Sequence, residues 1–278
     1  MAKLLSALPV GSVVKSTNTK YNGKVIRWIV GTQDTANGRT GLVTEKMITL
    51  KCFDAKEPSN PNGNRQSYGN NRYSQSNIDQ WLNSADAAWY SARHSYDAPP
   101  NNSNVWSSYN EYDAEAGFLT NFEADFRNAI LDAVIRVVKN TVTDGGGYED
   151  ITRKVFLLSN TEVGLSNENG VAEGPLWSYF SSAARRQCYP TAEAVSNSEY
   201  TSSSLNASSY WWWWLRTPYA GHADVARLVS AGGSLSDYSA YFGSAGVRPA
   251  LYLESGNLVS DSTDTDGAYI LQWNQPPS

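Results

Sequence analysis

Few residues of this chain have the types and spacing that catalysis requires. Its two histidines, His94 and His222, stand alone in polar segments, although acid–base and nucleophilic catalysis depend heavily on histidine. Cys52 and Cys188 are the only cysteines. This count favours two buried thiols over a disulfide framework or a cysteine-based zinc site, with a single bridge between them as the alternative. The sequence therefore predicts no catalytic residue and no cofactor.

Two segments bear a partial likeness to calcium sites. Asp261, Asp264 and Asp266 before Gly267 resemble a calcium loop, but the spacing fails, because Trp273 stands where a bidentate glutamate is needed. Residues 57–60 echo the calcium-dependent sugar-binding tripeptide of C-type lectins, with an extra serine in between. A solvated turn is the better interpretation of the aspartates, and no metal ligand is predicted. A carboxylate pair for glycoside hydrolysis leaves no mark in a sequence, and no segment points to one.

Composition narrows the class of protein. The chain has 278 residues, 41% of them hydrophobic and 18% charged, which is enough for a packed core. The net charge of −5 and the absence of a lysine or arginine cluster argue against a nucleic-acid partner. The start of the chain lacks the apolar length of a signal peptide, and no apolar run reaches the roughly 18 residues of a membrane span. We expect a protein made in the cytosol, with no membrane insertion.

The first half of the chain combines strands, loops and short helices. Asn22-Gly23 is a hairpin turn signal between the alternating segments 10–16 and 24–31, with a third strand expected at 41–50. Ser76 is placed to cap a helix over about 77–83. Thr120 and Glu123 have capping-box spacing. The sequence also predicts loops over 56–75 and 95–113. The apolar residues expected on the core side of a helix from Thr120 are Phe122, Phe126, Ile130, Val134 and Val137.

The second half becomes richer in strands toward its end. A glycine run at 145–147 breaks the chain, a short buried strand is expected at 155–158, and helices at 174–187 and 191–196. Further strands are predicted at 210–216, 224–230, 233–238 and 246–253, and one more after the polar turn near 261–267, before a loose end at 276–278. No boundary divides the chain. The prediction is a single α+β domain over 1–278, a mixed antiparallel sheet with flanking helices and long loops.

The four-tryptophan run at 211–214 begins the most specific part of the sequence. Alternate residues of a strand point to opposite faces, so at least one of these rings should line a surface, while Arg216 should pair with a carboxylate in the core. From Thr217 to Leu253 the chain has no Trp, Met, Gln, Glu or Lys. These are types that codons ending in C or T cannot encode. Such a restriction is what randomisation of the first two codon bases leaves behind.

With these motifs, the chain resembles the DUF6273 family. The bracketing motifs are WWLRTP at 213–218 and GVRPAL at 246–251. Further matches lie at 26–28, 76–83, 155–159 and 189–191. Such proteins are similar to the C-type-lectin-fold variable proteins of diversity-generating retroelements, which include phage receptor-binding proteins. The resemblance implies a C-type-lectin-like fold of the formylglycine-generating-enzyme-like variant, with a variable ligand-binding segment at about 217–250.

The resemblance also implies which side chains bind the ligand. The scaffold would be formed by Trp213, Trp214, Arg216, Arg248 and Pro249. Trp211 and Trp212 would also belong to the scaffold, unless they join the binding face. The expected ligand-binding residues are Trp211, Trp212, His222, Asp224, Val225, Leu228, Ser236, Asp237, Tyr238, Ser239, Phe242, Ser244 and Ala245. Tyrosine and phenylalanine among serine, glycine and alanine are also the composition of antibody binding sites.

The functional prediction is a binding protein rather than an enzyme. It would be a phage or prophage tail component that recognises a cell-surface protein or glycan, as a homo-oligomer or attached to a tail structure. Two alternatives remain open. One is a catalytic domain like the formylglycine-generating enzymes, which needs a reactive cysteine pair or a metal. The other is a structural virion domain with no ligand of its own.

Overall fold

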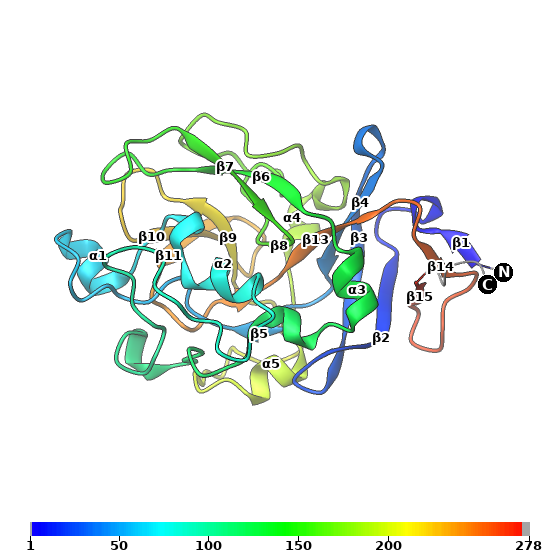
Figure 1. Cartoon of the computed structure of the whole chain (residues 1–278), viewed down its shortest axis with the longest axis horizontal. Coiled ribbons are helices and arrows are strands. Elements are labelled where there is room, and N and C mark those ends of the chain that lie inside the picture. Colours follow the sequence, from blue (N-terminus) through cyan, green and yellow to red (C-terminus); the bar gives the residue numbers. More distant parts are fainter. Residues whose placement is uncertain (1, 274–278) are drawn as a thin grey trace.

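The computed structural model describes residues 2–273, so the loose end expected at 276–278 lies outside the described residues. Over this range the chain is a mixed α+β protein that is mostly sheet with short helices (Figure 1). The α+β class and the mixed, largely antiparallel sheet predicted from the sequence are confirmed. The helices are α1 (Gly63–Tyr68), α2 (Asn77–Leu82), α3 (Ala124–Ala129), α4 (Ala183–Arg186) and α5 (Ala192–Ser196).

The larger sheet joins the two ends of the described chain. Its strands, in spatial order, are β1 (Ala2–Leu4), β14 (Leu258–Ser260), β15 (Tyr269–Gln272), β2 (Val13–Tyr21), β3 (Lys24–Asp34), β4 (Arg39–Thr44), β13 (Ala250–Glu254) and β8 (Val155–Phe156). The β15–β2 pair is parallel and its other pairs are antiparallel. Asn22 and Gly23 turn the β2–β3 hairpin with φ of 49° and 76°, as the sequence predicts.

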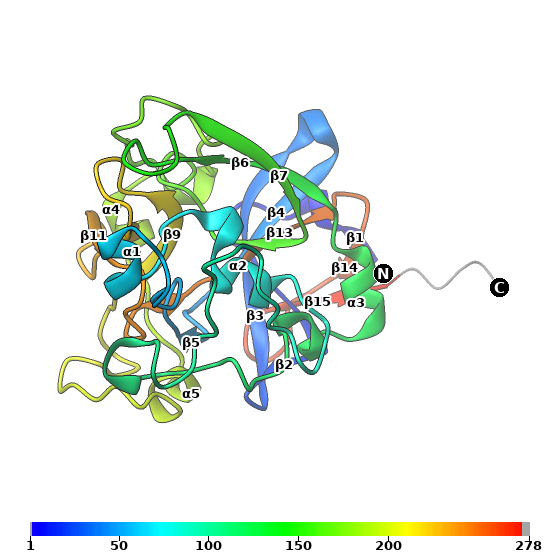
Figure 2. The same cartoon turned by 60° about the vertical axis from the view of Figure 1, so that its left-hand side comes forward.

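A second sheet carries the segment in which variation is expected. Its strands, in spatial order, are β11 (Leu235–Ser239), β10 (Val225–Val229), β9 (Trp213–Pro218), β12 (Gly246–Val247) and β5 (Thr49–Leu50). The strands predicted at 210–216, 224–230 and 233–238 are therefore confirmed, with shifted ends. The single strand predicted at 246–253 is wrong, because the chain passes there from β12 in this sheet to β13 in the larger one. A separate ribbon pairs β6 (Ala133–Val138) with β7 (Tyr148–Arg153) around the glycine run. Figure 2 shows α1 and β11 grouped at the end of the molecule away from β1 and β14.

The prediction of one long helix starting at Thr120 is wrong. The Thr120 hydroxyl donates to the carbonyl of Gly117, inside a 3-10 turn (Phe118–Asn121), and α3 begins only at Ala124. Val134 then lies in β6 opposite Thr152 and is 66% exposed. The apolar residues fitted a helical period, but residues 134–138, four of which are valine or isoleucine, pair as a strand instead. Phe122, Phe126, Ile130 and Val137 are nevertheless buried.

Other local predictions hold in part. Ser76 caps α2 by accepting a hydrogen bond from the Asp79 amide. The expected loop at 56–75 also contains α1 and a 3-10 turn at Tyr73–Gln75, and the loop at 95–113 contains a 3-10 turn at Trp106–Ser108. The helix expected at 174–187 is a 3-10 turn (Ser178–Phe180) followed by the four-residue α4. Further 3-10 turns lie at Leu5–Ala7 and Thr35–Asn37.

Two buried arginines fix the ends of the candidate variable segment. Arg216 is fully buried and pairs with Glu162, with 2.6 Å between Nη1 and Oε2, which confirms the expected core carboxylate. Arg248 donates from Nε to the Thr44 carbonyl, and its guanidinium lies 5.0 Å from the Trp213 ring centre. A buried charge is tolerated only when it is paired or hydrogen-bonded. Both arginines therefore belong to the scaffold that holds β9 and β12.

Candidate binding surface

The candidate ligand-binding residues fall into three groups by exposure. His222, Asp237 and Tyr238 are exposed. Trp212, Val225, Ser236, Ser239 and Phe242 are half-buried. Trp211, Asp224, Leu228, Ser244 and Ala245 are buried, with at most 5% of each residue exposed. A direct role in binding is compatible with the first two groups only.

The buried group is a correction to the sequence interpretation, because its members stabilise the sheet. Leu228 lies opposite Trp214 in the β10–β9 pair and is 2% exposed. The Ser244 carbonyl accepts a hydrogen bond from the indole of Trp211, which is itself 4% exposed. The carbonyls of Asp224 and Ala245 accept backbone hydrogen bonds from Ala240 and Lys51.

The strand β11 is the free edge of the second sheet within the described residues, and its exposed side chains are not all free. Asp237 pairs with Arg227 on β10, 2.9 Å from Oδ2 to Nη1. The same guanidinium contacts Glu168 and lies 3.9 Å from the Tyr219 ring centre. Tyr238, in contrast, has 37% of its surface exposed. The edge therefore offers an aromatic ring beside an already paired carboxylate.

Tyr238 belongs to a larger aromatic cluster. Its nine members are Tyr68, Trp106, Tyr109, Tyr200, Trp211, Trp212, Tyr238, Tyr241 and Phe242. Six of the rings form a closed circuit with these centroid separations: Trp106–Phe242 4.4 Å, Phe242–Tyr238 4.0 Å, Tyr238–Trp212 6.1 Å, Trp212–Trp211 4.9 Å, Trp211–Tyr200 6.2 Å and Tyr200–Trp106 6.1 Å. Tyr109, Tyr241 and Tyr68 extend the circuit. Every member except Trp211 is at least partly exposed.

Sequence reasoning missed five members of this cluster, namely Tyr68, Trp106, Tyr109, Tyr200 and Tyr241. Tyr68 is the last residue of α1, and Tyr241 lies in the turn after β11. Trp106 and Tyr109 belong to one loop, and Tyr200 belongs to another. Aromatic residues inside otherwise Asn- and Ser-rich loops were the signal that could have identified them. Such rings have little core to pack into unless the loops meet.

Backbone hydrogen bonds bring these loops together. The Trp106 amide donates to the Tyr241 carbonyl and the Tyr241 amide to the Tyr68 carbonyl, each at 3.0 Å. The Asn110 side chain donates to the Gly243 carbonyl at 2.6 Å and accepts from the Glu199 amide at 2.9 Å. The aromatic cluster is therefore held by main-chain contacts that do not depend on its own rings.

The 107–110 loop also has an unusual backbone. Ser107, Ser108 and Asn110 have φ of 51°, 58° and 59°, a region that residues other than glycine rarely adopt. Such strain persists only where the surrounding structure fixes it. Gly243 lies against this loop so closely that an added Cβ would collide with the Tyr109 carbonyl oxygen.

The cysteines and acidic residues that were considered for catalysis or metal binding lie outside the aromatic cluster. Cys52 and Cys188 are unbonded and buried, as favoured from the sequence, and burial raises the pKa of both thiols. Asp264 and Asp266 form ion pairs with Lys15 in an exposed turn. Glu57 is buried beside His94, Asn60 and Asn70. Residues 2–273 contain no group of three or more His, Cys, Asp or Glu side chains arranged to hold a metal ion.

Fold and surface together define an α+β protein whose partly exposed aromatic cluster is carried by loops and by one sheet edge. The chain belongs to the family described as a domain of unknown function, DUF6273, whose model matches residues 37–255. Both bracketing motifs lie inside the match, whereas β1 to β3 and β14 to β15 lie outside it. No curated protein and no solved structure matches the chain. Within the described part of the chain, no helix has the length and apolar character to cross a membrane.

Proposed function

We propose that this protein binds a ligand through the aromatic cluster and the adjoining edge strand β11. The observation that carries the proposal is the closed circuit of rings, five of whose six members are partly exposed on surface loops and strands. Tyrosine and tryptophan provide large contact area with few rotamers to immobilise, which is why they dominate binding hot spots. A preformed cluster lowers the entropic cost of binding further, because its rings already hold one another.

The proposal includes a C-type-lectin-like fold and a variable segment. Its support is that strands from the two ends of the described chain pair in one sheet, β1 with β14 and β15 with β2, while the candidate surface lies at the other end of the molecule (Figures 1 and 2). Variation would be confined to exposed and half-buried positions. These are His222, Val225, Ser236, Asp237, Tyr238, Ser239 and Phe242, together with Trp212, which directly precedes β9. The natural target is a cell-surface protein or glycan, and the natural setting is a phage or prophage tail.

The adjacent DNA tests the variable segment. A reverse-transcriptase gene and a near-copy of the sequence encoding 217–250 are expected beside this gene. Adenines in that copy should fall in the codons of the exposed and half-buried positions. Adenines concentrated in the codons of Leu228, Ser244 and Ala245 would contradict the surface assignment, because variation there would disturb the core.

Binding is tested by removing two rings of the cluster. Tyr238→Ala with Phe242→Ala should weaken binding to intact bacterial cells and to an arrayed glycan panel by about tenfold or more, as for hot-spot aromatics. Tyr148→Ala is the matched control, since Tyr148 is 47% exposed on β7, outside the cluster. Equal binding by both variants would overturn the proposal. Binding to neither cells nor glycans by the unaltered protein would favour the structural virion domain.

The catalytic alternative is less well supported by the structure. It requires a reactive cysteine pair or a metal. The thiols of Cys52 and Cys188 are both buried, and their raised pKa disfavours the thiolate that such chemistry uses.

A further inference from the structure

A cavity of about 350 Å³, lined mostly by polar residues, lies at the N-terminal end of α1, whereas the last residue of that helix joins the aromatic cluster. Arg65 and Tyr68 both belong to α1, and Arg65 lines the cavity whereas Tyr68 joins the cluster. The cavity is lined by Asn60, Pro61, Asn62, Arg65, Arg72, Gln75, His94, Ser95, Tyr96, Thr143 and Asp144. Its volume falls at the lower end of the roughly 300–1,000 Å³ typical of small-molecule sites.

Hydrogen-bond donors dominate the lining. Arg65 uses Nε and Nη2, and Arg72 uses the same two atoms, while neither Nη1 donates a hydrogen bond within residues 2–273. Gln75 accepts from Asn70 through Oε1, and its Nε2 has no acceptor among the described residues. Tyr96 adds an exposed hydroxyl-bearing ring at the rim. Two guanidinium N–H groups and one amide therefore have donors left for a ligand.

Both arginines of the lining already contact a carboxylate. Asp144 Oδ2 accepts from Arg65 Nη2 at 2.7 Å and from Asn140 Nδ2 at 2.8 Å, and its side chain is only 4% exposed. Glu149 accepts from Arg72 Nε at 3.0 Å and from Arg72 Nη2 at 2.7 Å. These ion pairs fix the two guanidinium groups, and each Nη1 is the donor that remains for a ligand.

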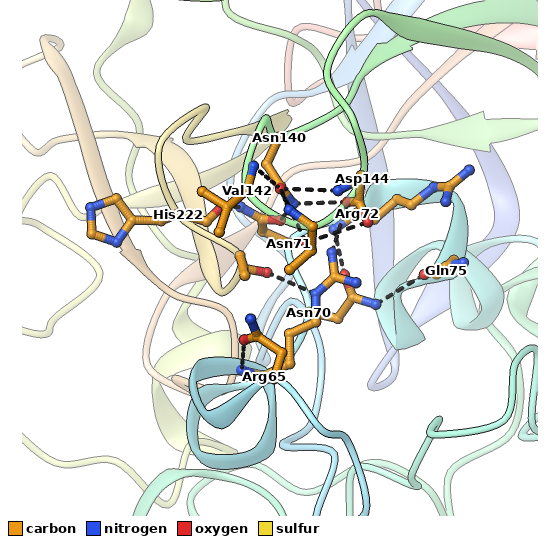
Figure 3. A network of polar contacts seen from close by, with 12 residues as sticks. Arg65, Asn70, Asn71, Arg72, Gln75, Asn140, Val142, Asp144 and His222 are labelled. Atoms are coloured by element: carbon orange, nitrogen blue, oxygen red, sulfur yellow. Dashed lines mark hydrogen bonds and ion pairs between the residues drawn. The ribbon is translucent and has the colours of Figure 1, made fainter.

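A rigid polar network supports the cavity from behind. Figure 3 shows Asn140 linked to both Asp144 and Asn71. Asn71 in turn donates to the His222 carbonyl at 2.7 Å. Because Asn71 and Asn140 are fully buried, the guanidinium of Arg65 is held in one orientation rather than moving freely in solvent.

From this arrangement we infer a second binding site, for a carboxylate group carried by a hydroxyl-rich small molecule such as a uronic acid. Arginine N–H groups match the planar carboxylate, and charge-assisted hydrogen bonds of this kind are about twice as strong as neutral ones. The Gln75 amide and the hydroxyls of Ser95 and Tyr96 are suited to sugar hydroxyls. The site uses none of the nine aromatic rings, so it goes beyond the proposed function and can fail without affecting it.

The test uses ligand-observed NMR titration of the full chain with D-glucuronate, and with D-glucose as the neutral probe. Glucuronate should bind saturably and glucose should not. Gln75→Glu keeps the oxygen that accepts from Asn70 but replaces the free donor by a negative charge, so it should weaken glucuronate binding about tenfold or more. Gln66→Glu is the matched control, because Gln66 is exposed on α1 and does not line the cavity.

Three results would overturn the inference: glucuronate binding no tighter than glucose, equal weakening by both glutamate variants, or full competition by inorganic phosphate at equal concentration. The last would show a general anion site without preference for a carboxylate. Should Gln75→Glu fail to fold, Arg72→Gln removes one free guanidinium donor and is expected to weaken glucuronate binding in the same way. The Tyr238→Ala, Phe242→Ala double variant should bind glucuronate normally.

Discussion

Phe242 packs on Trp106 with ring centroids 4.4 Å apart and an interplanar angle of 30°. The first ring follows the edge strand of the candidate variable segment, and the second belongs to a loop in the middle of the chain. Six of the nine rings of the aromatic cluster thus come from residues outside the 217–250 segment. Changes at Phe242 would alter a surface whose other rings stay in place.

Gly243→Ala should displace this contact. The added Cβ would collide with the Tyr109 carbonyl oxygen, which belongs to the strained 107–110 backbone and cannot move like a flexible side chain. We expect a loss of about 1–3 kcal/mol of unfolding free energy. The near-ultraviolet circular dichroism of the aromatic cluster should also change. Gly256→Ala is the control, since nothing lies within 4 Å of its added Cβ. Identical spectra for both variants would contradict the proposed packing.

Leu228 and Ser236 are direct neighbours across β10 and β11, and their substitution should have very different consequences. Leu228 is 2% exposed, so Leu228→Ala should cost about 2–5 kcal/mol in urea unfolding. Ser236 is half-buried on the edge strand, and Ser236→Ala should stay within about 0.5 kcal/mol. Similar losses at the two positions would mean that β11 is as much a part of the core as β10.

The sequence predicted the features that depend on neighbouring residues. Asn22 and Gly23 form the hairpin turn themselves, and Ser76 accepts from the Asp79 amide three residues further on. Both signals are therefore local. The prediction of a helix from Thr120 failed because contacts with a distant part of the chain determine the structure of this segment. Ile130 bridges to Leu253, and the Leu131 amide donates to the Tyr252 carbonyl, contacts that no local pattern reveals.

The candidate site also divides into residues that the sequence could identify and residues that only the folded chain reveals. Tyr238 and Phe242 could be selected from their composition and from the bracketing motifs. Trp106 and Tyr200 could not, because only the folded chain brings their loops to the same place. Leu228 was selected from the family resemblance alone, and this selection was wrong. Four successive residues of β10 are buried, so both faces of the strand are covered and Leu228 packs inside the protein.

Glu173 should make stability depend on pH. Burial raises the pKa of its carboxyl to about 7, against the opposing effects of Arg216 and of the Thr217 hydroxyl. The folded state therefore keeps a proton that the unfolded chain loses near its ordinary pKa of about 4.5. Stability rises with pH only where the unfolded state binds more protons, so here the free energy of unfolding should fall as pH rises from about 4.5 to 7. The contribution is at most about 3 kcal/mol.

Glu173→Gln isolates this contribution, because its amide oxygen can still accept from Thr217 Oγ1, as the carboxylate does at 2.5 Å. The variant should lose part of the decline in stability between pH 4.5 and 7 in urea titrations at several pH values. Burial also raises the pKa of Asp54 and Asp97, so a smaller decline should persist. Glu254→Gln, which removes an exposed carboxylate from β13, should follow the unaltered protein. If Glu173→Gln shows the full decline, the Glu173 carboxyl is already ionised in the folded state across this range.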